Sequence, residues 1–240
     1  MTARDDVLAA VRSALRSEPR LDLHRFPIAV SLDEDALILE GEVADIAQKK
    51  LALERAAAVP GSAGILDRLR VRPAERMGDK QVRNAVRDAL LGEPAFGEIA
   101  LYEIDAGEKK AVHTPDGARG SVVVEVSDGV VTLDGQVPGL GHKRLAGVLA
   151  WWVPGSRDVI NGLAVEPPEE DNDAEIADAV RIALEKDMFV NAGQIRIGVK
   201  NAVVTLAGLV PSEAEREMAE FDAWYVFAVD KVVNRIEVHP

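Results

Sequence analysis

The chain has 240 residues, of which 48% are hydrophobic and 29% are charged, and its formal net charge at pH 7 is −13. This balance is that of soluble globular proteins and excludes the apolar-poor composition of disordered chains. The negative charge argues against a nucleic-acid partner, because phosphate contacts need clustered Lys and Arg. The sequence contains no cysteine, which excludes disulfides, thiolate nucleophiles and cysteine-bound zinc.

The two segments that could engage a membrane both have the wrong pattern for it. Residues 1–20 carry Asp5 and Asp6 in an amphipathic stripe, where a secretory signal would have an uninterrupted apolar core. The longest apolar run, Leu145 to Val153, is too short to span a bilayer. We therefore expect a protein that is not transmembrane and is cytoplasmic, with a periplasmic or membrane-peripheral location as the alternative.

Residues 1–75 predict the order helix, strand, strand, helix, strand. Apolar residues recur every four positions in the first helix, and alternating apolar residues mark a strand with one buried face. The segment ALILEGEV predicts the second strand, and Asp45 is a good first residue for the second helix. The apolar positions are Val7, Val11, Leu15, Ile28, Val30, Leu32, Ile65, Leu69 and Val71.

Residues 78–168 and 173–240 repeat this order, and the charged, proline-bound segment 167–173 links them. Pro138 opens the second helix of the middle copy, and Pro211 with Ser212 opens that of the last copy. The middle copy carries an insertion of roughly twenty residues near 97–120. It predicts either an extra hairpin beside the first strand or a mobile recognition loop.

A shared register supports three copies of one module. The second strands end at Gly41, Gly135 and Gly208, and a proline follows each glycine 32 residues later, at Pro73, Pro167 and Pro240. Each helix and strand has one apolar stripe to bury, so two helices should cover one face of a three-stranded mixed sheet. The sequence predicts an α+β fold of three tandem α-β-β-α-β modules.

This pattern resembles the BON domain, a bacterial module with the same order of elements and a glycine closing its second strand. The resemblance covers nearly the whole chain three times, in the tandem arrangement of osmotic-stress BON proteins. It implies a role in osmotic stress or envelope integrity, association with phospholipid, and no catalysis.

Reactive residues do not form a recognisable site in the sequence. The histidines His24, His113, His142 and His239 occupy non-equivalent repeat positions and lack a paired nucleophile. The acidic cluster at Asp33, Glu34 and Asp35 lacks the spacing of a calcium loop. We therefore expect no catalytic residue, no metal and no cofactor, and we read the repeat glycines as positions of close backbone packing.

The basic residues Arg68, Arg70 and Arg72 alternate with Leu69 and Val71 in the third strand of the first copy. Alternation places the three guanidinium groups on one solvent-facing side. Net charge falls from −1 in residues 1–77 to −4 in 78–168 and −8 in 169–240. The row is predicted to contact phospholipid headgroups or an acidic partner, with a solubilising surface as the alternative.

Trp151 and Trp224 occupy the same repeat position, 16 residues after the repeat glycine, where the first copy has Ala57. At 100° per residue this position lies about 120° from the buried positions Leu145 and Met218, so both rings should be peripheral. They could pack between copies or in a dimer, contact a membrane or external partner, or belong to the local core.

Two functions remain open on these observations. The favoured one is a non-enzymatic bacterial binding or scaffold protein of the stress or envelope class, which binds anionic phospholipid or a protein partner through linked modules. The alternative is a structural, self-assembling protein, including a homo-oligomer, whose copies pack on each other or on a second chain.

Overall fold

The computed structural model describes residues 3–34, 36–61 and 63–239. The chain divides into two compact units, Met1–Arg72 and Pro73–Pro240. Asp35 and Pro240, which the sequence patterns above include, lie outside the described residues. The first unit holds repeat 1, and the second holds repeats 2 and 3.

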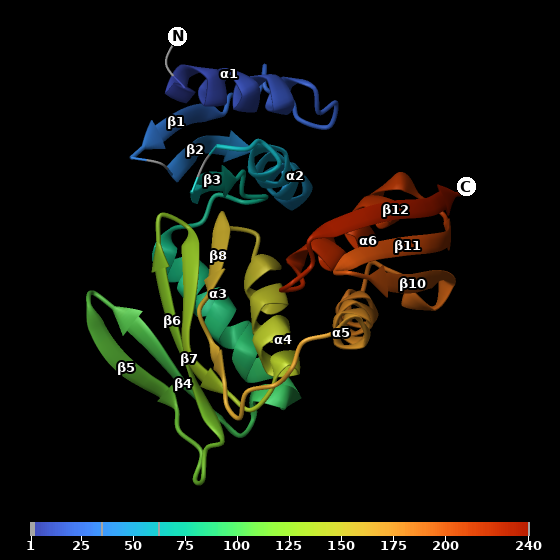
Figure 1. Ribbon diagram of the computed structural model, residues 1–240. Coiled ribbons are helices and arrows are strands. Elements are labelled where there is room, and N and C mark those ends of the chain that lie inside the picture. The colour runs from blue at the N-terminus through green and yellow to red at the C-terminus, as the bar shows by residue number, and fades with distance from the viewer. Residues whose placement is uncertain (1–2, 35, 62, 240) are drawn as a thin grey trace. The chain divides into compact units, whose positions relative to one another are not determined.

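Repeat 1 consists of two helices over one face of a three-stranded sheet (Figure 1). The central strand β2 runs antiparallel to β1 and parallel to β3. The core between helices and sheet includes Val11, Leu15, Leu37 and Leu39. The elements are α1 (Ala3–Arg16), β1 (Ala29–Asp33), β2 (Ala36–Val43), α2 (Ile46–Ala57) and β3 (Gly64–Val71).

Repeat 2 has the same core, enlarged by its insertion. The inserted residues form the antiparallel hairpin β4–β5, and β4 pairs in parallel with β6, which makes a six-stranded sheet. The insertion is therefore a hairpin and not a loop. The elements are α3 (Asp79–Gly92), η1 (Pro94–Phe96), β4 (Ile99–Asp105), β5 (Glu108–His113), β6 (Gly120–Ser127), β7 (Val130–Val137), α4 (Leu140–Trp151), β8 (Asp158–Asn161) and β9 (Ala164–Val165).

Repeat 3 returns to the three-stranded form, with β11 between antiparallel β10 and parallel β12. Its elements are α5 (Asp173–Lys186), η2 (Ala192–Gln194), β10 (Ile195–Lys200), β11 (Val203–Val210), α6 (Glu213–Tyr225) and β12 (Lys231–Val238). Six helices longer than one turn and three mixed sheets confirm, for the described residues, the α+β fold of tandem modules.

The repeat glycines are needed because the backbone at or just before the start of the preceding strand passes too close for a side chain. A Cβ atom on Gly208 would lie 2.0 Å from the carbonyl oxygen of Gln194, and one on Gly135 would lie 2.2 Å from that of Ser121. A Cβ on Gly41 would lie 2.6 Å from the oxygen of Pro27. Gly41 and Gly135 also have positive φ angles. Close backbone packing is thus their structural role.

An aspartate at the start of the first helix ties that helix to the hairpin turn in two repeats. In repeat 3, Asp173 accepts hydrogen bonds from the backbone N–H groups of Ala202 and Asn201, at 2.9 and 2.8 Å, and these bonds lower its pKa. In repeat 2, Asp79 accepts from the turn at 2.8 and 3.0 Å in the same way. In repeat 1, Arg4 instead donates to the carbonyl oxygen of Glu34 at 2.6 Å.

Candidate binding surfaces

Repeats 2 and 3 are joined by a seam in which α4 packs against α5 and α6 (Figure 1). The ring of Trp151 on α4 stacks on that of Tyr225 on α6, with centroids 5.5 Å apart and planes inclined by 15°. Next to it, Trp152 donates its indole N–H to a carboxylate oxygen of Asp222 at 2.8 Å. Of the alternatives considered for Trp151, the structure therefore shows packing between two copies of the module.

Trp224 is buried, with 1% of its surface exposed, so the expectation of a peripheral position for this residue is wrong. Helix α6 contacts its own sheet, α5 and also α4 of the preceding repeat. The helix is therefore covered on more sides than a single module would cover, and the angular argument from one apolar stripe fails. Trp224 does not present a ring to a membrane or to an external partner.

Charged residues inside the seam are paired across it. Arg144 on α4, only 1% exposed, forms an ion pair with Asp171 and donates to the backbone carbonyl of Phe227 at 3.3 Å. Lys143 lies over the ring of Phe227, 4.4 Å from its centroid. Arg144 is buried whereas Asp171 is partly exposed, and loss of the Asp171 carboxylate would leave the buried guanidinium without its ion-pair partner. These contacts therefore help to fix repeats 2 and 3 relative to each other.

The carboxyl group of Asp222 is the most strongly perturbed titratable group of the seam. Its pKa is raised to about 8, chiefly by burial and also by the neighbouring carboxyl of Asp187, while the hydrogen bond from Trp152 acts in the opposite direction. Its second oxygen, Oδ2, is buried without a hydrogen-bond partner in the described residues. Below pH 8 the neutral acid is therefore favoured in the folded protein.

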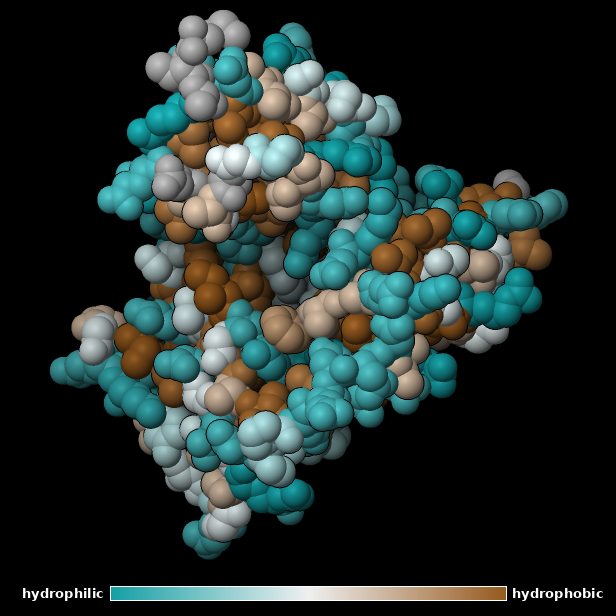
Figure 2. Space-filling view, viewed as in Figure 1, coloured by the Kyte–Doolittle hydropathy of each residue, from teal (hydrophilic) through white to brown (hydrophobic). Residues whose placement is uncertain are grey.

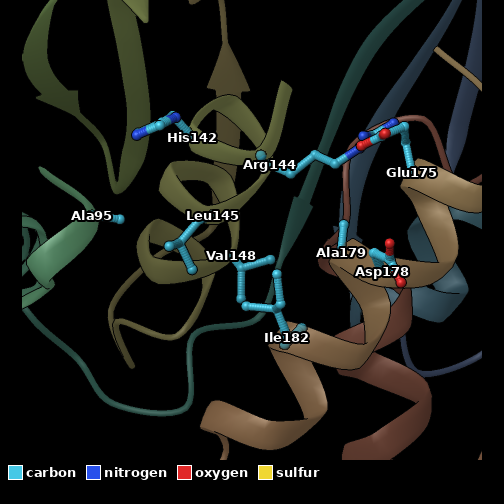
Figure 3. Close-up of a pocket in the computed structure, with 11 residues that line it drawn as sticks. Ala95, His142, Arg144, Leu145, Val148, Glu175, Asp178, Ala179 and Ile182 are labelled. Carbon is cyan, nitrogen blue, oxygen red and sulfur yellow. The ribbon is translucent and has the colours of Figure 1, made fainter. Parts of the chain in front are cut away.

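A groove of about 210 Å³ lies in the seam between α4 and α5. Figure 3 shows Leu145 and Val148 of α4 on one side and Ile182 of α5 on the other, while Arg144 extends towards Glu175. Drug-sized ligands and cofactors occupy cavities of about 300–1,000 Å³. The groove therefore suits an apolar side chain of a binding partner better than a cofactor.

The arginine row of repeat 1 lies on the helix-free face of its sheet, with carboxylates beside it. In the parallel pairing of β2 and β3, Glu40 lies opposite Arg68 and Glu42 lies opposite Arg70. A guanidinium nitrogen of Arg68 is 3.9 Å from a carboxylate oxygen of Glu40. Arg72 is exposed just beyond the strand. The row is thus a ladder of mixed charge and not an isolated cationic stripe.

The helix-free faces of the other two sheets differ from this ladder. Ile160 of β8, in repeat 2, is 51% exposed. Figure 2 shows a group of hydrophobic residues, coloured brown, in the region of β8. On repeat 3, the corresponding face carries basic residues that the net charge of that repeat conceals. The sequence could have indicated them, because positions 196 and 200 in β10, and 231 and 235 in β12, are an even number of residues apart and therefore lie on the same face of the sheet.

Two histidines of repeat 2 make local contacts. His142 makes an edge-on contact with Phe96, with centroids 5.9 Å apart, and His113 lies 3.2 Å from the carbonyl oxygen of Gly97. In the described ranges, no three His, Asp or Glu side chains are grouped so that they could hold a metal ion. In the same ranges, no helix is both long enough and apolar enough to cross a membrane.

These features define a class of small α+β modules that are joined in tandem and expose one face of each sheet. The family model of the BON domain matches residues 4–73, 112–167 and 172–240, and the chain therefore belongs to the BON family, with three tandem domains. The middle match begins within the inserted hairpin, at residue 112. BON domains are non-catalytic binding domains, which makes a binding or scaffold protein the broad class of this chain.

Two solved structures of CdsD, a structural protein of the type III secretion system of Chlamydia trachomatis, are similar to the chain. The C-terminal domain of CdsD is 12% identical, with 98% of each chain covered and a TM-score of 0.25. The second structure is 13% identical, with 98% of this chain and 93% of that chain covered and the same TM-score. Similarity at this level carries no argument about function. No curated protein matches the chain.

Proposed function

We propose that the chain is a non-enzymatic scaffold of the bacterial stress or envelope class that binds a protein partner. The observation that carries this proposal is the seam between repeats 2 and 3, where the buried Arg144 pairs with the partly exposed Asp171 and holds two modules as one platform. A preassembled platform lowers the entropic cost of binding, and its groove offers a socket for an apolar side chain of the partner.

A protein partner is favoured over a lipid surface because the features that suit a membrane are engaged within the chain. Trp224 is buried, and Trp151 is half-buried with its ring stacked on that of Tyr225, so neither tryptophan presents a fully exposed ring as an interfacial anchor. Glu40 and Glu42 flank the arginine row and would face the same headgroups that the arginines attract. Mixed charges of this kind suit a protein surface better than a uniformly anionic bilayer.

Anionic phospholipid remains the second candidate, with Arg68, Arg70 and Arg72 as its contacts. Co-sedimentation with phosphatidylglycerol vesicles and with phosphatidylcholine vesicles, at low and at physiological salt, separates the two candidates. We expect the protein to stay in the supernatant in every condition. The protein-partner proposal is overturned if anionic vesicles alone pellet the protein and replacement of the three arginines by alanine prevents it.

A matched control for that variant removes three exposed arginines near the end of α1, namely Arg16, Arg20 and Arg25. It changes the net charge by the same amount without touching the sheet face. Equal loss of pelleting in both variants would indicate a response to net charge rather than recognition by the row.

Packing of repeats on one another, the structural alternative, is realised inside the chain by repeats 2 and 3. Assembly between chains would need a further surface, because Trp151 already contacts Tyr225 of the same chain. Light scattering over a range of concentrations tests this alternative. A mass that stays at 25.8 kDa supports a monomeric scaffold, and a mass that rises with concentration supports self-assembly.

A further inference from the structure

The helix-free face of the repeat 3 sheet places basic side chains on both sides of its central strand. In the strand register, Arg196 of β10 and Arg235 of β12 lie on either side of Ala207. Lys200 and Lys231 lie on either side of Val203 in the same way. The helix-covered face is identified by the buried residues that alternate with these positions, namely Ile195, Val204, Leu206, Val232 and Ile236.

This face is basic, although repeat 3 as a whole is acidic. Residues 169–240 contain seven basic and fifteen acidic residues. Four of the seven basic residues lie on the helix-free face, and Glu237 is the acidic residue that lies with them on these strands. Among the described residues, no ion pair engages the side chains of Arg196, Lys200 or Arg235. Their charges are therefore available to an anionic ligand.

The surface between the two basic rows has the dimensions of one polypeptide strand. Neighbouring strands are about 4.8 Å apart, so the rows on β10 and β12 are separated by about 10 Å. A hollow of about 700 Å³ lies here, lined by Arg196, Ala207 and Arg235 and, at one end, by Leu209 and Glu237, which lie opposite each other. Ala207 is small, and Leu209 is 51% exposed, which adds an apolar contact to the floor.

We propose that this face binds an acidic, extended segment of the partner protein, with carboxylates between Arg196 and Arg235 and an apolar side chain on Leu209. The inference rests on the proposed function, since it names the chemistry of the protein partner. Arginine and carboxylate groups form two parallel hydrogen bonds, which gives both affinity and register.

A protein segment fits better than a nucleic acid or a bilayer for two reasons. First, a duplex or a membrane extends beyond the face and meets the remaining acidic surface of a repeat whose net charge is −8. Charges interact across a Debye length of about 8 Å at physiological salt, so a narrow segment avoids that repulsion. Second, the exposed Leu209 contributes to binding of an apolar side chain but not of phosphates.

The test uses the full chain and a fluorescein-labelled peptide of eight residues, with glutamate at alternate positions and serine or leucine between. Fluorescence anisotropy gives its affinity for the wild type and for the double variant Arg196→Ala, Arg235→Ala. We expect about a tenfold loss of affinity, because two surface ion pairs together contribute that much. A control peptide has glutamine in place of each glutamate. Its affinity for the wild type should be no higher than the affinity of the double variant for the acidic peptide.

The matched control is Arg181→Ala with Arg216→Ala, which removes the same charge from helices α5 and α6 of the same repeat. Its affinity should stay within about twofold of the wild type. Equal losses in both double variants, or no peptide binding by the wild type, overturn the inference and leave the groove between α4 and α5 as the partner site. Tighter binding of an oligothymidylate or of phosphatidylglycerol vesicles than of the peptide overturns the protein-partner proposal as well. Circular dichroism of each variant verifies that the fold is retained.

Discussion

Repeats 1 and 3 carry an arginine at the same position of the same module, and the two side chains have different surroundings. Arg68 and Arg235 both follow their repeat glycine by 27 residues. On the central strand, Glu40 lies opposite Arg68, whereas Ala207 lies opposite Arg235. One residue of the central strand thus determines whether the cation is paired within its own sheet or available to a ligand.

The comparison also shows that the net charge of a repeat is a poor guide to its binding face. Repeat 1 is almost neutral, but its arginine row is opposed by carboxylates. Repeat 3 is the most acidic of the three and nevertheless presents a basic sheet face. Recognition follows the local arrangement of charges, because screening limits the reach of distant ones.

The largest effect is expected from a substitution that destabilises the sheet of repeat 3 and with it the basic face. In the Gly208→Ala variant, a Cβ would lie 2.0 Å from the oxygen of Gln194, so we expect repeat 3 to lose about 3 kcal/mol or more of stability. Urea unfolding measures the loss. Gly198→Ala is the control on the same sheet, since no atom lies within 4 Å of its Cβ. Equal stability of the two variants would contradict the role of the repeat glycine.

Repeat 3 also differs from repeat 1 in the buried carboxyl group of Asp222, which lies at its seam with repeat 2. The pKa of Asp222 rises from 3.8 to about 8 on folding, so the folded state binds a proton that the unfolded state has lost. Stability should therefore fall as pH rises from about 4 to about 8. Asp222→Asn keeps an acceptor for Trp152 and should flatten this dependence and be more stable than the wild type at pH 8.5.

Urea unfolding at pH 5 and pH 8.5 checks this prediction, with the exposed substitution Asp178→Asn as a control. The control should show the pH dependence of the wild type. If Asp222→Asn keeps the slope of the wild type, the carboxyl group is ionised in the folded protein across this range and the prediction fails.

A smaller effect is expected from making the seam of repeat 2 resemble repeat 1, which has Ala57 where repeat 2 has Trp151. Trp151→Ala removes the stacking on Tyr225 and should lower the stability of the unit of repeats 2 and 3 by about 1–2 kcal/mol. Trp151→Phe keeps an aromatic ring and should recover most of the loss. Thermal unfolding of both variants provides the measurement, and identical midpoints would show that the stack contributes nothing.

The smallest effect should come from giving Arg68 of repeat 1 the surroundings that Arg235 has in repeat 3, without a carboxylate opposite it. Glu40→Ala removes the carboxylate beside Arg68 and should raise the affinity for the acidic peptide about threefold, since one exposed pair contributes up to about 1 kcal/mol. Glu75→Ala, on an exposed residue outside the sheets, changes the net charge equally and serves as the control. The same gain in both would mean that net charge alone acts.

The modules could be predicted from the sequence because their signals are local. The four-residue spacing of Val82, Val86 and Leu90 and the alternation of Val122, Val124 and Val126 each reflect one buried face, and all six contribute to the core of repeat 2 or pack against it. The repeat glycines likewise mark a constraint that acts within one hairpin.

The binding surfaces could not be predicted in the same way, because they depend on which residues become neighbours. The burial of Trp224 follows from packing of α6 in a unit of two repeats, which the pattern of one helix does not contain. The pairing of Arg68 with Glu40 and of Arg235 with Ala207 depends on strand register. The two residues of each pair are 28 positions apart and are brought together only by the parallel crossover.

The most direct test of the central claim places the residue of repeat 1 into repeat 3. Ala207→Glu puts a carboxylate between Arg196 and Arg235, and Ala207→Gln adds a side chain of the same size without charge. Anisotropy titration with the acidic peptide should show about a tenfold loss of affinity for the glutamate variant and little change for the glutamine variant. Equal affinities of the two variants would contradict the claim that the central strand controls the basic face.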